Sequence, residues 1–118
     1  MLELDYDRFA ATPVATDPFA HVVVPGFVPP DALGRVIAGL PALRKGGSFP
    51  IGSVPLGEAA AELMREMEGP VLRDAVARKF GLDLSDAPSM LTLRGWTGPK
   101  DGRIHVDSTA KRVTILLY

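Results

Sequence analysis

One stretch decides how this chain is interpreted: Asp101-Gly-Arg-Ile-His-Val-Asp-Ser-Thr-Ala-Lys-Arg-Val-Thr-Ile-Leu-Leu-Tyr118. Within it, His105 and Asp107 flank a single apolar residue, Val106, and form the one cluster of potential metal ligands in the sequence. In an extended segment residues i and i+2 project to the same side, with Cα atoms about 6–7 Å apart, so the imidazole and the carboxylate can share one ion. A second β-rich run follows at 113–118, so the whole segment predicts a strand, a turn and a second strand.

A His-x-Asp pair together with a second, distant histidine makes a facial triad, which binds Fe(II) and leaves the other positions open. The spacing alone more often marks a hydrogen-bonded surface pair than a metal site. Its context is more specific, because Gly-Arg-Ile-His-Val-Asp-Ser at 102–108 is followed by Lys111 and by Val-Thr-Ile-Leu-Leu-Tyr at 113–118. This pattern resembles the first metal-binding half of the 2-oxoglutarate and Fe(II)-dependent dioxygenases, specifically their prolyl-hydroxylase-like branch.

The resemblance extends upstream and so covers most of the chain. Met-Leu-Thr-Leu-Arg-Gly-Trp at 90–96 is similar to the preceding core strand, and His-Val-Val-Val-Pro-Gly-Phe at 21–27 to the entry strand. It implies one α+β domain over 1–118, with N-terminal helices packed on a partial double-stranded β-helix, or jelly-roll, sheet. In the family, the second metal histidine and the basic residue for the far carboxylate of 2-oxoglutarate lie downstream of the Leu-Leu-Tyr strand. We therefore expect a truncated, N-terminal portion of that fold.

The resemblance also implies the site. His105 and Asp107 would be the metal ligands, Fe(II) the metal and 2-oxoglutarate the cosubstrate, with no catalytic side chain assigned and the substrate open. Arg94 shares a face of its predicted strand with Trp96, and a buried arginine needs a partner. Arg94 would pair with the Asp107 carboxylate or with a carboxylate of the cosubstrate or substrate. Alternatively, it lies on an edge strand and its side chain reaches solvent. Trp96 is either a substrate-pocket wall or part of the core.

His21 is the other histidine of the sequence, on a predicted strand at 19–24. We expect it to be packed or hydrogen-bonded rather than to be the third ligand. A helix should begin at Pro29-Pro30 and end before Pro41. Its apolar stripe follows the i, i+3, i+4, i+7 pattern and should lie on a sheet. The stripe consists of Leu33, Val36, Ile37 and Leu40.

Two further helices are predicted at 58–68 and 70–80, the second with Gly81 as its C-terminal cap. The acids on their polar faces, Glu62 and Glu66 among them, are interpreted as solvated surface. Residues 1–18 should be peripheral, with a short edge strand at 2–6. The Gly-, Pro- and Ser-rich residues 44–57 predict a loop.

Composition narrows the classes of function. The formal net charge of −1 gives no field for nucleic acid or an anionic membrane, so we expect neither as a partner. Without cysteine there is neither a disulfide nor a thiolate metal site. Apolar runs are too short for a bilayer and no leader is evident, so we expect a cytoplasmic protein.

Two alternatives to a dioxygenase stay open. One is a non-catalytic remnant or interaction domain, in which a half jelly roll pairs with another chain. The other is a structural cupin-like domain with a different metal. If 113–118 is an interior strand, its edge would attract a second copy of the chain, which predicts a homodimer.

Overall fold

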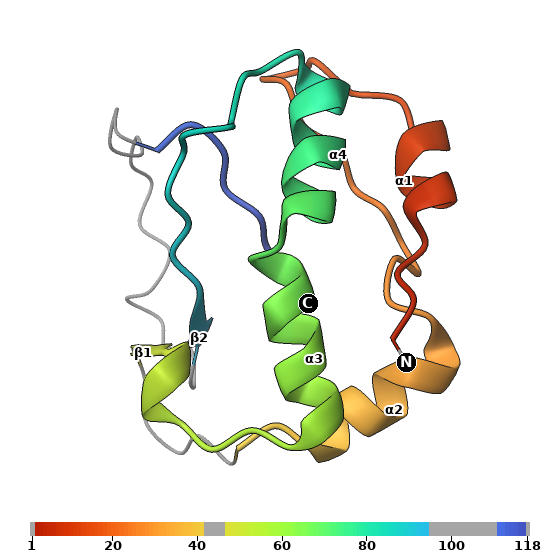
Figure 1. The fold of residues 1–118 in the computed structure, drawn as a ribbon. Helices are drawn as coiled ribbons and strands as arrows, with labels where there is room; N and C mark the ends of the chain where they lie inside the picture. The colour runs from red at the N-terminus through yellow and green to blue at the C-terminus, as the bar shows by residue number, and fades with distance from the viewer. Residues whose placement is uncertain (1, 42–46, 95–110, 118) are drawn as a thin grey trace.

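The computed structural model describes residues 2–41, 47–94 and 111–117. These residues form a mixed fold of helices and a two-stranded antiparallel sheet. In chain order its elements are α1 (Tyr6–Ala11), α2 (Pro30–Ala38), β1 (Ser48–Pro50), the 3₁₀ turn η1 (Ile51–Ser53), α3 (Glu58–Met67), α4 (Pro70–Phe80) and β2 (Thr92–Arg94). Helices α3 and α4 run end to end through the middle, with α1 and α2 to one side and the strands to the other (Figure 1). Within the described ranges, no helix is long and apolar enough to cross a membrane.

The two central helices confirm the sequence prediction. Gly69 separates them, and Pro70 opens α4, where a fixed φ suits the first turn and the missing N–H costs nothing. Gly81 then ends α4 with a φ of 64°, in the left-handed region that glycine adopts without penalty. The Leu82 N–H donates to the Ala77 carbonyl at 2.9 Å, which caps the last turn.

The N-terminal segment was wrongly predicted to be peripheral. Residue 6 begins a helix rather than ending a strand, because the Asp5 side chain caps α1 by accepting from the Arg8 N–H at 3.0 Å. Leu4, just before the helix, and Phe9, inside it, are both buried. Residues 2–9 therefore belong to the core, whereas residues 10–18 lie at the surface as predicted.

Helix α2 buries a different stripe from the predicted one. Val36 is buried as expected, but its buried partner is Ala32, while Ile37 remains 58% exposed and Leu33 40% exposed. Helices α2 and α3 come close at Gly39 and Gly57, where a Cβ on residue 57 would lie 2.7 Å from the Gly39 Cα. Exposed apolar residues on α2 follow from this choice of face.

Among the described residues the sheet has two strands, β1 and β2. Strand β2 lies inside the expected strand at 89–96, but its partner β1 comes from the segment predicted as a loop. Phe49 pairs with Leu93, and Pro50 ends the short strand, where its missing N–H costs little. The predicted strand at 19–24 is reduced to one antiparallel bridge between Ala15 and His21.

The core consists of two joined clusters of buried side chains. The first lies between α2, α3 and the N-terminal segment and contains Leu4, Val28, Ala32, Val36, Ala60, Leu63 and Met64. The second lies between α1 and α4 and contains Phe9, Leu72, Val76 and Leu84. Tyr6, Phe27 and Met67 contact both clusters, with the Tyr6 and Phe27 rings edge to face at a centroid distance of 5.4 Å. The helices are thus one packed unit.

Candidate functional site

The predicted metal ligands fall outside the described residues. This applies to His105, Asp107 and Trp96, which all lie within 95–110. Arg94 is the last residue of β2 and pairs with Ser48 through its backbone, while its side chain lies outside the description. The structure therefore describes the residues on either side of the motif, up to 94 and from 111 to 117.

The upstream flank, β2, follows the predicted alternation. Leu91 and Leu93 are half-buried and pack against the first core cluster, whereas Thr92, between them, is exposed. Successive side chains of a strand point to opposite faces, so one face of β2 rests on the helices. The strand is positioned by this apolar contact.

The downstream flank, 111–117, is neither helix nor strand in the structure, so the strand predicted at 113–118 was wrong for the described residues 113–117. Val113 packs against the second core cluster, and the Arg112 guanidinium donates to the Asp83 carbonyl at 2.8 Å. Asp83 lies in a turn where its carboxylate accepts from the Ser85 hydroxyl at 2.7 Å and from the Ser85 N–H at 3.1 Å. These bonds hold the pKa of Asp83 below its usual value, and the nearby Arg112 charge acts in the same direction.

His21 is hydrogen-bonded, as predicted. Its Nδ1 lies 2.7 Å from the Phe19 carbonyl oxygen, which can only accept, so Nδ1 carries the proton. The His21 ring also lies against the Phe19 ring at a centroid distance of 5.3 Å, and its backbone bonds Ala15 in both directions. Among the described residues no group of three or more His, Cys, Asp or Glu side chains is arranged to hold a metal ion.

Two carboxylates on α3 were predicted to be solvated and instead make contacts with the N-terminal segment. Glu66 accepts from the Tyr6 hydroxyl at 2.6 Å, and Glu62 accepts from the Leu2 N–H at 2.7 Å. Burial, followed by the bond to the Glu66 carboxylate and its charge, raises the pKa of the Tyr6 phenol well above its ordinary value. Both contacts join residues 60 positions apart, so no local sequence pattern announces them.

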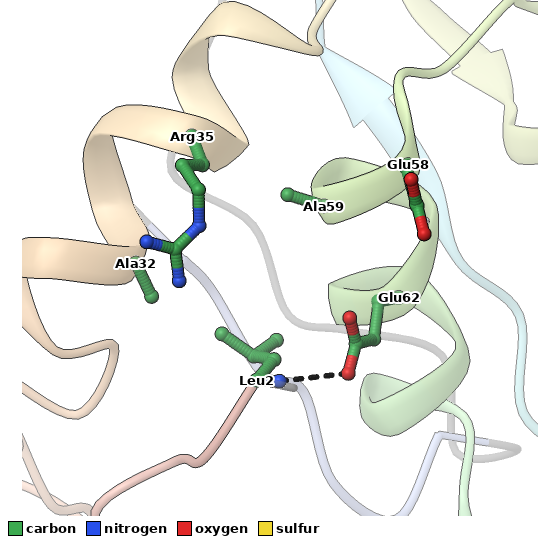
Figure 2. Close-up of a pocket in the computed structure, with 6 residues that line it drawn as sticks. All are labelled: Leu2, Ala32, Arg35, Glu58, Ala59 and Glu62. Atoms are coloured by element: carbon green, nitrogen blue, oxygen red, sulfur yellow. Dashed lines mark hydrogen bonds between the residues drawn. The ribbon is translucent and has the colours of Figure 1, made fainter.

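The second of these contacts borders a cavity of about 300 Å³ between α2 and α3 (Figure 2). Arg35 lines it from α2, while Glu58 and Glu62 line it from α3. Its remaining walls are apolar and consist of Leu2, Ala32 and Ala59. The only sequence signal for this site is the polar face of each helix, which equally fits a solvated surface.

Comparisons with models of protein families, with curated proteins and with solved structures find no match for this chain.

Proposed function

We propose that this chain is the N-terminal, metal-binding part of a 2-oxoglutarate and Fe(II)-dependent dioxygenase of the prolyl-hydroxylase-like branch. One observation carries the proposal: His105-x-Asp107-Ser108 occurs in the context of Gly102 before it and Lys111 and Val-Thr-Ile-Leu-Leu-Tyr after it. The described fold supports it with helices N-terminal to an antiparallel strand that precedes the motif. The jelly-roll sheet is part of the proposal.

The donor set suits the metal. A neutral imidazole and a carboxylate are two of the three ligands of a non-haem Fe(II) site, and the Asp107 carboxylate would offset part of the metal charge. Bound Fe(II) would activate dioxygen, the oxidant for hydroxylation of a C–H bond, and 2-oxoglutarate would be decarboxylated to succinate as the second electron donor. Arg94 would meet a carboxylate of the cosubstrate or orient Asp107, and Trp96 would form part of the substrate pocket wall.

The test is an anaerobic calorimetric titration of the chain with Fe(II), with and without 2-oxoglutarate. We expect weak iron binding and no succinate from these 118 residues, because they carry two of the three family ligands. His105→Ala and Asp107→Ala should each weaken binding by at least the roughly 10–100-fold that loss of an outer-shell partner costs. His21→Ala is the matched control and should bind as the wild type does.

Two results would redirect the proposal. Iron binding that is unchanged in both His105→Ala and Asp107→Ala would make the motif structural. Tight binding with succinate production would place a third ligand within the chain, and His21 would be the first residue to test.

A second candidate, an interaction domain, is favoured by the exposed apolar run that follows the motif. Ile115, Leu116 and Leu117 are 48%, 65% and 47% exposed, although they are consecutive and apolar. Exposed apolar patches can mark interaction sites, and the proposed partner is a second copy of the chain, which would contact these side chains rather than a strand edge. Sedimentation should then show a dimer that Leu116→Asp dissociates, whereas a monomer at high concentration would contradict this candidate.

A further inference from the structure

The cavity between α2 and α3 has the size of a small-ligand site. The pocket is partly open to solvent, and its volume is about 300 Å³. Ligand pockets begin at about this volume. An occupant would have on the order of ten non-hydrogen atoms, which is the size of an amino acid.

The charged groups around the cavity face one another without pairing. No salt bridge joins Arg35 to Glu58 or Glu62; in the described part of the chain the ion pair present is Arg8–Asp5. One Arg35 N–H donates to the Asp31 carbonyl of the same helix at 3.1 Å. A guanidinium has five N–H groups, so others remain for a ligand. Figure 2 shows its side chain extending from α2 into the space that it shares with Glu62 of α3.

The carboxylates also keep acceptor capacity. One Glu62 oxygen accepts the Leu2 N–H, and a carboxylate has about four lone-pair sites. Glu58 lies one helical turn before Glu62 on α3, so the two acids follow the same helix face. Opposite Arg35 there are thus two acceptor groups.

The pattern of charge selects a class of ligand. A simple anion is repelled by two carboxylates, and a simple diamine leaves Arg35 without a partner. The three charged groups sum to one net negative charge, which a molecule with one carboxylate and two cationic groups would neutralise. The walls formed by Leu2, Ala32 and Ala59 suit the methylenes between those groups.

We propose that the cavity binds a free basic α-amino acid such as lysine. Arg35 holds the ligand carboxylate, as guanidinium groups do in bidentate fashion, and Glu58 and Glu62 hold the two cationic groups. The proposal is independent of the iron site, because all its residues lie outside the His105–Asp107 motif. The charged residues are partly solvated, so we expect a dissociation constant of about millimolar order.

The experiment is a titration of the ¹⁵N-labelled chain with lysine, followed by amide chemical shifts. We expect saturable shifts at Leu2 and along 32–35 and 58–62. Arg35→Gln should weaken lysine binding by roughly 2–5-fold, the effect of one partly exposed ion pair. It should not weaken the binding of pentane-1,5-diamine, which lacks the carboxylate, and should strengthen it because the repulsion by the Arg35 charge is gone.

Glu58→Gln should weaken both ligands, and it leaves the Glu62–Leu2 bond intact, so loss of folding does not confuse the result. Arg78→Gln on α4 is the matched control, since it removes one exposed charge far from the cavity residues in sequence and should bind lysine as the wild type does. Absence of saturable shifts at the cavity would overturn the proposal. Equal binding of lysine by Arg35→Gln and wild type, or equal binding of glutamate and lysine, would also overturn it.

Discussion

The close approach of α2 and α3 predicts that Gly57→Ala will destabilise the fold. A Cβ at residue 57 would lie 2.7 Å from the Gly39 Cα, a backbone atom that moves only with the end of α2. At the same point the Gly57 N–H donates to the Gly39 carbonyl at 2.7 Å. Relieving the overlap separates the helices and stretches this bond, and it disturbs Ala60, which is fully buried.

The magnitude follows from these contacts. Overpacking costs about 1–3 kcal/mol and a lost hydrogen bond about 0.5–1.5 kcal/mol. Reduced freedom of the unfolded chain returns about 0.4–1 kcal/mol, so the free energy of unfolding should fall by about 0.5–4 kcal/mol. Urea unfolding followed by far-UV circular dichroism measures it, with the m-value as the check that compactness is unchanged.

Gly34→Ala is the matched control on α2. No atom lies within 4 Å of the Cβ position at residue 34, so alanine there should stabilise the helix by about 0.5–1 kcal/mol. The reasoning is refuted if Gly57→Ala is as stable as the wild type, or if the two variants lose equal stability.

Three further predictions concern the core and its titrating groups. Leu63 is 1% exposed, so Leu63→Ala should lower the free energy of unfolding by about 2–5 kcal/mol. Val23 is 72% exposed, so Val23→Ala should change it by no more than about 0.5 kcal/mol in the same urea assay. Tyr6→Phe should lose about 1–3 kcal/mol at neutral pH. Because the folded-state pKa of Tyr6 is raised, its contribution is complete below the ordinary tyrosine pKa and is lost as pH rises through the folded value, so alkaline unfolding curves of wild type and variant should converge. For Asp83 the pH dependence of stability is opposite, because its folded-state pKa is lowered: its contribution is present above the ordinary carboxyl pKa and is lost as pH falls through the folded value. In Ser85→Ala, an NMR titration should show a higher pKa of Asp83 than in the wild type. An unchanged pKa would contradict the assigned cause.

Local signals predicted α2, α3 and α4 well, missed α1, and predicted the packing of the helices less well. Pro70 and Gly81 punctuate α4 in the sequence as they do in the structure. The face that α2 buries was mispredicted because periodicity weighs large apolar residues, while the fit to α3 depends on Ala32 and on the contact of Gly39 with Gly57. Such close approaches are properties of a helix pair, so one helix alone does not show them.

The proposed functional residues divide in the same way. His105 and Asp107 were proposed as ligands because the motif around them, from Gly102 to Tyr118, is local in the sequence. Glu62 was predicted to be solvated, since its contact with Leu2 spans 60 residues and needs the fold to bring the two together. The charged cavity was missed for this reason.

The most direct test of the proposed iron site uses the two histidines of the chain as separate reporters. Their ring resonances, assigned with His21→Ala, would be followed by NMR during anaerobic titration with Fe(II), a paramagnetic ion that broadens the signals of its ligands. The proposal predicts that the His105 resonances broaden at lower iron concentration than those of His21, and that Asp107→Ala shifts this broadening to higher iron concentration. Broadening of His21 first, or a response of His105 that Asp107→Ala leaves unchanged, would contradict it.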